Sequence, residues 1–230
     1  MKKDFTVLVL NSFVFFGAVI ATTAAAEPEF KSELFKKGKL VYSDTFDGKY
    51  SSERWGMPKG KTVKDGELTI LALHKTKEEA MKKLGRDHHL GLEPVGHMKG
   101  LPETFVCHMR FKYESDSITP HRPMWQIGHH MITINYLEGG GHKVRLPNKG
   151  PVFDEKASAM AINEWVDVEI EYKPGKLRLS INGKSKVYEH EKVSMHNPKD
   201  KHGPRFTFKH GIQGDNSRIV FDHVYLWEAE

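Results

Sequence analysis

Cysteine is almost missing from this sequence, since Cys107 is the one cysteine in 230 residues. An internal disulfide is therefore excluded, and the fold must be held by buried apolar surface, which a domain of this size can supply. Long apolar runs are also missing after the first 26 residues. A helix needs about 20 apolar residues to cross a bilayer, so we expect no membrane span in that part of the chain.

Clusters of one charge sign are missing too. The 35 Lys and Arg residues and the 30 Asp and Glu residues leave a formal charge of +5, and the basic residues are scattered along the chain. A nucleic-acid-binding protein usually carries a coherent basic face, so we expect no nucleic-acid partner. The sequence also lacks a glycine-rich phosphate loop and a Gly-x-Ser-x-Gly nucleophile elbow, which removes the usual signatures of nucleotide binding and serine hydrolysis.

The first 26 residues have the pattern of an export signal. Lys2 and Lys3 precede a largely apolar run, and Ala24-Ala25-Ala26 supplies the small-x-small pattern that signal peptidase recognises. We predict cleavage before Glu27, which leaves residues 27–230 as the mature protein. We expect this protein to be secreted or periplasmic, because export without disulfides is typical of a bacterial periplasm or cell surface.

Alternation of apolar and polar side chains with a period of two dominates the mature chain and indicates β-strands. Clear examples are 105–113 and 165–172, and Asn182-Gly183 is a strong signal for a tight hairpin turn. One short helix is expected, within 75–84. Many short strands with almost no helix predict a single all-β domain, in which two antiparallel sheets pack face to face as a sandwich.

Several short segments carry a resemblance to a known fold. They are 42–48 with Trp55, 63–68, 163–170, 177–184, 211–213 and 219–225. Their order resembles the concanavalin A-like lectin/glucanase jelly roll, and most of all the bacterial secreted domain described as 3-keto-disaccharide hydrolase. The resemblance implies a jelly-roll sandwich that holds a carbohydrate on one concave sheet, and it implies hydrolysis of a glycoside or disaccharide there.

A polar row on the strand 105–113 could line such a sheet. His108 and Arg110 alternate with the apolar residues of that strand, and an arginine can hold a carboxylate through two hydrogen bonds. We place both residues in a sugar-binding groove, His108 as a substrate contact and Arg110 with a catalytic role. The alternative is an ordinary solvated face.

A second polar group follows in the segment 121–130. Gln126 lies beside Trp125 and shortly before the pair His129-His130. Neighbouring residues on a strand point to opposite faces, so we expect at most one of the two histidines beside Gln126. A histidine suits proton abstraction because its pKa is near neutrality. We predict His129 and His130 as catalytic candidates, with Gln126 and Trp125 as substrate contacts. The alternative is a structural pair at a strand end.

The long loop 75–102 adds His88 and His89 as predicted substrate contacts. With Asp87 they could ligate a metal, but the run lacks the spacing that brings two ligands to one ion. We therefore predict no catalytic metal and no cofactor. A structural calcium near Asp47 and Asp222 remains an option, with turn chemistry as its alternative.

Acidic side chains at Asp167, Glu169 and Glu171 have the spacing of a glycosidase carboxylate pair. Their strand leads into surface hairpins, so we expect them on a solvated outer face. Three functions stay open at this point. They are a hydrolase acting on a glycoside or disaccharide, a lyase acting on an acidic polysaccharide, and a lectin-like module that binds carbohydrate without catalysis.

Overall fold

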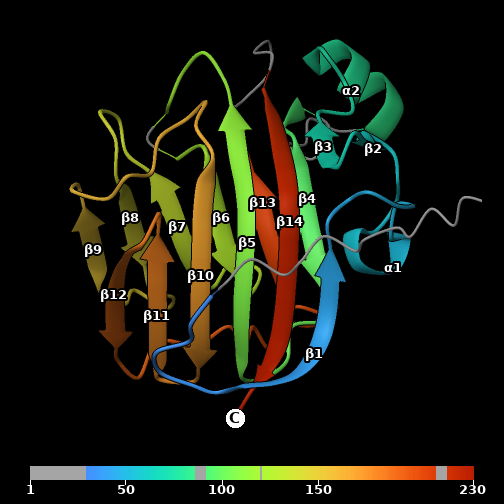
Figure 1. Cartoon of the computed structure of the whole chain (residues 1–230). Helices are drawn as coiled ribbons and strands as arrows, with labels where there is room; N and C mark the ends of the chain where they lie inside the picture. The colour runs from blue at the N-terminus through green and yellow to red at the C-terminus, as the bar shows by residue number, and fades with distance from the viewer. Residues whose placement is uncertain (1–29, 86–91, 120, 211–216) are drawn as a thin grey trace, which may run out of the picture.

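The computed structural model describes residues 30–85, 92–119, 121–210 and 217–230. The predicted export signal, its cleavage position, and His88 and His89 lie outside the described residues. Within them, two antiparallel sheets pack face to face, as the alternation predicts. We refer to the eight-stranded sheet as sheet A and to the six-stranded sheet as sheet B, and Figure 1 shows sheet A in front. No helix in the described part of the chain is long and apolar enough to span a membrane.

Sheet A has eight strands. Their bounds are β1 (Lys37–Asp44), β2 (Lys61–Lys64), β3 (Glu67–Leu71), β5 (Phe105–Glu114), β10 (Val166–Lys173), β11 (Lys176–Ile181), β12 (Lys184–Glu189) and β14 (Arg218–Ala229). The order across the sheet is β12-β11-β10-β5-β14-β3-β2, and β1 also pairs with β14. The first and last strands of the described chain therefore lie side by side in this sheet.

Sheet B has six strands in the order β4-β13-β6-β7-β8-β9. Their bounds are β4 (Val95–Lys99), β6 (Met124–Ile127), β7 (Ile132–Tyr136), β8 (His142–Arg145), β9 (Val152–Glu155) and β13 (Arg205–Lys209). Two short helices complete the described elements, α1 (Ser52–Trp55) and α2 (Lys77–Leu84). The sequence predicts α2 but not α1.

The hairpin signal at Asn182-Gly183 is confirmed. Both residues lie between β11 and β12 and have positive φ, 48° and 77°. Positive φ at both central positions gives the turn a twist that matches the flanking strands. The predicted three-stranded meander is therefore present as β10, β11 and β12.

The core lies between the two sheets. Alternate residues of β5, including Phe105, Cys107 and Met109, are fully buried there, as their parity predicts. Trp125 is also fully buried in this core, where its ring stacks on Phe208 with centroids 6.3 Å apart. This placement differs from the expected substrate contact. Trp125 and Gln126 are neighbours on one strand, so when Gln126 points outward Trp125 points into the core.

The segment before β1 packs across the outer face of sheet A, and Figure 1 shows it crossing in front of β11 and β10. Its backbone N–H groups at Glu33, Leu34 and Phe35 all donate to the carboxylate of Glu171, at 2.7–2.9 Å. Arg178 donates to the same carboxylate at 3.2 Å. Glu171 is fully buried, so the expectation that it lies on a solvated face is wrong. The N-terminal segment covers it.

Strand β14 changes phase in its middle. Phe221 and Val224 both lie in the core, although a regular strand would place residues three apart on opposite faces. The pairing with β5 shows a register shift between Phe221 and His223. A bulge of this kind adds one residue and re-aims side chains. Here it directs Asp222 and His223 together to the outer face of sheet A.

Candidate functional site

Polar residues on neighbouring strands gather on the outer face of sheet B. Thr207 of β13 pairs with His97 of β4 on one side and with Gln126 of β6 on the other. Gln126 pairs in turn with Thr133 of β7, and Thr133 with Arg145 of β8. Paired residues of antiparallel strands point to the same face. These five side chains therefore form a continuous row across five strands.

This outer face is polar and yet largely inaccessible to water. Gln126 and Asn135 are each 3% exposed, and Thr207 is fully buried. An outer sheet face that met bulk water would leave such side chains exposed, so neighbouring segments must fold over it. One such segment is 193–203, where the Asn197 side chain donates to the backbone oxygen of His129 at 2.9 Å.

A tight turn between β6 and β7 holds the two adjacent histidines. Gly128 and His130 have φ of 73° and 63°, and the N–H of Met131 donates to the oxygen of Gly128. His129 and His130 thus lie in a turn rather than on a strand, and their ring centroids are 3.9 Å apart. The expectation that strand alternation separates them is wrong, because the turn breaks the alternation.

One threonine links two of the histidines. His97 Nδ1 and His129 Nδ1 lie 3.1 Å and 3.3 Å from Thr207 Oγ1. Close by, Gln126 donates to Thr133 Oγ1 at 3.1 Å and accepts the backbone N–H of His130 at 3.3 Å. Gln126 therefore lies beside the turn that carries both histidines, as the sequence predicts. His97 and Thr207 complete the cluster and were not predicted.

The histidines of this face are held neutral. Burial lowers the pKa of His97 to about 3, with Arg205 and His129 adding to the effect. Burial also lowers the pKa of His129 to about 4, followed by the effects of His130 and Arg205. Both imidazoles are therefore uncharged at neutral pH and offer a nitrogen lone pair, which proton abstraction requires.

Two cations on this face form no ion pair among the described residues. Lys209 is only 3% exposed and interacts electrostatically with Glu93, and Arg145 has a buried Nε without a hydrogen-bond partner. Among the described residues no carboxylate forms an ion pair with either one, whereas Arg205 pairs with Asp200 at 2.7 Å. Arg145, Arg205 and Lys209 give the outer face of sheet B positive charge, which favours an anionic ligand.

Carboxylates are scarce on the same face. At the outward positions of the six described strands, Asp154 on the edge strand β9 is the one acid, and it pairs with Lys143 at 3.4 Å. Glu93 lies just before β4 and pairs with Arg122 at 3.3 Å. Burial raises the pKa of Glu93 despite this partner. The central row of the described strands thus has no pair of adjacent carboxylates.

The predicted residues His108 and Arg110 lie elsewhere. They point outward from β5 in sheet A, while Gln126 points outward from β6 in sheet B. His108 is 3% exposed and its Nε2 lies 2.8 Å from Asp167. The expectation that these residues line one sheet with Gln126 is wrong, since the core separates the two outer faces. One ligand on one face cannot contact both groups.

The option of a structural calcium stays a prediction. Asp47 accepts a hydrogen bond from Thr45 in the turn after β1. Asp222 accepts from His223 and pairs with Arg110 at 3.7 Å. Both carboxylates therefore already have protein partners in the structure.

Comparison with known proteins defines the fold further. No protein-family model matches the sequence, and no curated protein matches it either. Among solved structures, a β-glucanase from Bacillus licheniformis aligns with TM-score 0.56 at 8% identity, covering 84% of this chain and 100% of that one. A laminarinase from Flavobacterium sp. UMI-01 aligns with TM-score 0.53 at 13% identity, covering 83% and 100%.

A xylan β-1,4-xylosidase from Bacillus halodurans aligns with TM-score 0.53 at 12% identity over 87% of this chain. This chain spans only 41% of the length of that xylosidase. At such low identities the likeness shows the fold alone. The chain has the concanavalin A-like jelly-roll fold that the sequence resemblance implies, and the narrower likeness to the 3-keto-disaccharide hydrolase domain stays a prediction.

Proposed function

We propose that this protein acts on a carboxylate-bearing glycan, which it binds on the outer face of sheet B. The observation that carries the proposal is the positive charge of this polar face, where Arg145 and Lys209 form no ion pair among the described residues, although Glu93 interacts with Lys209. A guanidinium holds a carboxylate through two parallel hydrogen bonds. Sugar hydroxyls would find partners in amide and hydroxyl side chains such as Gln126 and Asn135. Export, as the first 26 residues predict, would bring the protein to extracellular polysaccharides.

The reaction that this face supports best is β-elimination. A lyase neutralises the carboxylate of a uronate and abstracts the proton on C5. The C4–O bond then breaks as a C4=C5 double bond forms, and the departing oxygen takes up a proton from water or from the protonated base. In this proposal Lys209 neutralises the carboxylate and His129 accepts the proton, while Arg145, three strands away on β8, binds a neighbouring carboxylate of the same glycan. The low pKa of His129 partly reflects nearby cations. A bound carboxylate would offset those cations and raise the pKa of His129 toward neutrality, which makes it a better base.

Hydrolysis is the second candidate, because one observation favours it. Burial raises the pKa of Glu93, and a raised pKa is typical of a general acid in glycoside hydrolysis. A retaining glycosidase also needs a second carboxylate about 5–5.5 Å away, and the described strands of sheet B offer none in the central row. Elimination does not need this second carboxylate, so the residues of this face support it better than hydrolysis.

A panel of neutral and acidic polysaccharides tests the proposal. With an acidic substrate we expect new reducing ends together with the absorbance of an unsaturated uronate. His129→Ala should lower kcat by at least about 100-fold, since general base catalysis contributes about that much, while Glu93→Gln should keep most of the activity.

Other outcomes would each overturn a part of the proposal. Reducing ends without unsaturated product, with loss of activity in Glu93→Gln, would establish hydrolysis. Binding without any product would establish a lectin-like module. If no acidic glycan is bound or cleaved, the proposed function fails as a whole.

A further inference from the structure

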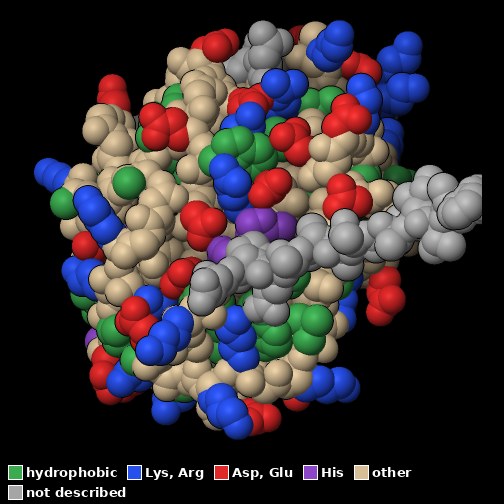
Figure 2. Space-filling model, in the orientation of Figure 1, with side chains coloured by type: hydrophobic (Ala, Val, Ile, Leu, Met, Phe, Trp, Pro, Cys, Tyr) green, Lys and Arg blue, Asp and Glu red, His purple; other side chains and the backbone are tan. Residues whose placement is uncertain are grey.

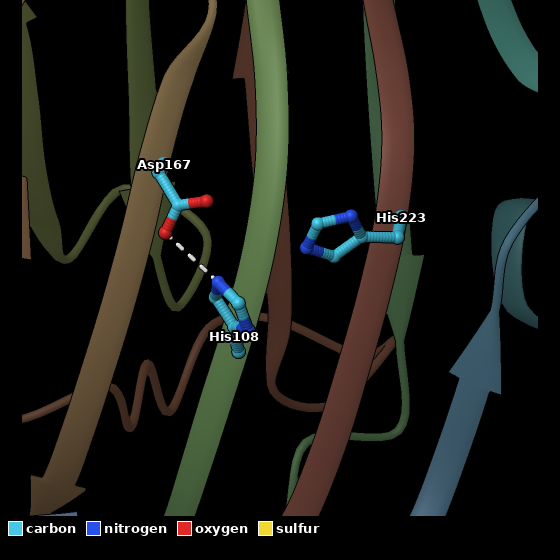
Figure 3. A group of neighbouring side chains, drawn as sticks. All are labelled: His108, Asp167 and His223. Carbon is cyan, nitrogen blue, oxygen red and sulfur yellow. Dashed lines mark hydrogen bonds and ion pairs between the residues drawn. The ribbon is translucent and has the colours of Figure 1, made fainter. Parts of the chain in front are cut away.

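Three side chains converge on the outer face of sheet A, on the opposite side of the molecule from the proposed glycan face. They are His108 of β5, Asp167 of β10 and His223 of β14, and their ligand atoms all lie within 4.8 Å of one another. Figure 3 shows the His223 ring pointing from β14 toward the other two side chains. Three adjacent strands of one sheet therefore supply two imidazoles and one carboxylate to a single point.

We propose that His108, Asp167 and His223 form a binding site for a divalent transition-metal ion, with zinc as the ion that fits best. Zinc binds imidazole nitrogen and carboxylate oxygen at about 2.0–2.2 Å. Two ligand atoms of a tetrahedral ion are then about 3.3 Å apart. His108 Nε2 and Asp167 Oδ1 are 2.8 Å apart, and all three ligand atoms lie within 4.8 Å of one another, so side-chain rotations would bring them to that spacing. Calcium and magnesium prefer all-oxygen sites, so they fit this set poorly.

The hydrogen bonds around the cluster match those of a metal site. His223 Nδ1 lies 2.9 Å from Asp222 Oδ2, and a carboxylate in this position fixes the ring of a metal-bound histidine. The opposite nitrogen, Nε2, is buried and has no hydrogen-bond partner, and His223 as a whole is 8% exposed. A buried imidazole nitrogen without a partner is unfavourable, and an ion would satisfy it.

Asp167 and His108 leave room for the same ion. His108 Nε2 lies 2.8 Å from Asp167 Oδ1, so a proton occupies the position between them when no ion is bound. Zinc would displace this proton, since a metal-bound histidine must offer a lone pair. Arg110 lies 3.7 Å from Asp222. Asp167 and Asp222 supply two carboxylates to this region, against one guanidinium from Arg110, and this acidic excess favours a cation.

The surroundings set the accessibility of the site. The ring of Phe30 lies 5.5 Å from the ring of His108 and covers one side. The Asp167 side chain is 43% exposed, and Figure 2 shows histidine at the surface of this face among acidic and basic side chains. Three protein ligands beside an opening to solvent leave one position for water or a ligand, which is the arrangement of catalytic rather than structural zinc sites.

The bulge in β14 creates this cluster. Without it, regular alternation would place only one of Asp222 and His223 on the outer face. The extra residue brings both outward, so the metal ligand and the carboxylate that orients it come from adjacent positions. Bulges often occur beside functional sites for this reason.

Zinc titration of the full chain without a histidine tag tests the proposal. We expect one zinc ion per chain by calorimetry, and a tetrahedral absorption spectrum with cobalt(II) in its place. Asp167→Ala and His223→Ala should each weaken zinc binding by at least about 100-fold, and Asp222→Asn by about 10–100-fold. His196→Ala, an exposed histidine outside the cluster, is the matched control and should bind zinc normally.

Thermal unfolding separates loss of the site from loss of the fold. Zinc should raise the midpoint of the wild type and of His196→Ala, but not that of Asp167→Ala, because only a ligand of the folded state stabilises it. Zinc binding of equal affinity in His223→Ala, or no binding to the wild type, would overturn the proposal. Neither result depends on glycan activity, because the two sites lie on opposite outer faces.

Discussion

Glu171 shows how one carboxylate fixes the start of the folded chain. Burial alone would raise its pKa, but the hydrogen bonds from Ser32 and from three backbone N–H groups outweigh burial and lower the pKa. The ionised form is thus the stable one at neutral pH. The N-terminal segment contacts sheet A through this group, through the ion pair of Glu33 with Arg178 at 2.7 Å, and through Phe30, which packs on Trp227.

We therefore predict that Glu171→Ala lowers the free energy of unfolding by about 2–4 kcal/mol, because it leaves several buried N–H groups unsatisfied. Urea denaturation of the variant checks this value. Glu189→Ala is the control, since its ion pair with Lys176 is largely exposed and should contribute less than about 1 kcal/mol. Equal stabilities of the two variants would show that the N-terminal segment is not held by Glu171.

At the scale of elements, the turn between β6 and β7 positions His129 and His130. Gly128 has φ of 73°, and a Cβ there would lie 2.2 Å from the backbone oxygen of Met195. Gly139, in the next turn, has φ of 81° but open space around a Cβ. Alanine substitutions at these two glycines therefore distinguish the effect of backbone strain alone from the effect of strain together with steric overlap.

Gly139→Ala should lower the free energy of unfolding by about 1–2 kcal/mol, which is the usual effect of positive φ on alanine. Gly128→Ala should lower it further and should also weaken glycan turnover, because the segment around Met195 must move away from the turn. Thermal unfolding and activity of both variants check this. Similar effects of the two substitutions would show that the Met195 contact does not hold the turn.

Sequence patterns predict much of the fold and only half of the site, for a physical reason. A period of two tells which residues share a face, so the core residues of β5 and the hairpin at Asn182-Gly183 are predictable. It does not tell which sheet a strand joins, because that depends on pairing between distant segments. His108 was therefore grouped with Gln126, although they lie on different sheets.

Other features of the structure are not revealed by alternation alone. Outward positions of β8 and β13 carry Arg145 and Lys209, but their importance depends on burial and on the scarcity of carboxylates on the described strands beside them. The phase change between Phe221 and Val224 could not be predicted, because residues 219–227 are apolar at both parities apart from Asp222 and His223. Only the register with β5 reveals the bulge that turns both residues outward.

At the scale of the whole molecule, buried neutral histidines make stability depend on pH. Burial lowers the pKa of His97 to about 3, and of His142 and His210 to about 4. In the unfolded chain a histidine takes up a proton below about pH 6.5. Between pH 6.5 and 4 the unfolded chain therefore binds more protons than the folded one, so acidification favours unfolding.

We predict that the free energy of unfolding falls as the pH is lowered from 7 to 5, by up to about 1.4 kcal/mol per pH unit for each fully buried histidine. Carboxylates with lowered pKa values titrate below this window. Denaturation at several pH values measures the slope, and His97→Gln should reduce it. A flat profile between pH 7 and 5 would show that these histidines become protonated in the folded state.

The central claim is that the outer face of sheet B, and not that of sheet A, binds an anionic glycan. Arg145 and Arg110 provide a matched pair, because each is a partly exposed arginine on one outer face. The most direct test is calorimetric binding of an acidic oligosaccharide to Arg145→Ala and Arg110→Ala. Losing a paired charge contact costs about 2–5 kcal/mol, so we predict at least a tenfold weaker affinity for Arg145→Ala and an unchanged affinity for Arg110→Ala. The reverse pattern would contradict the account and place the glycan on sheet A.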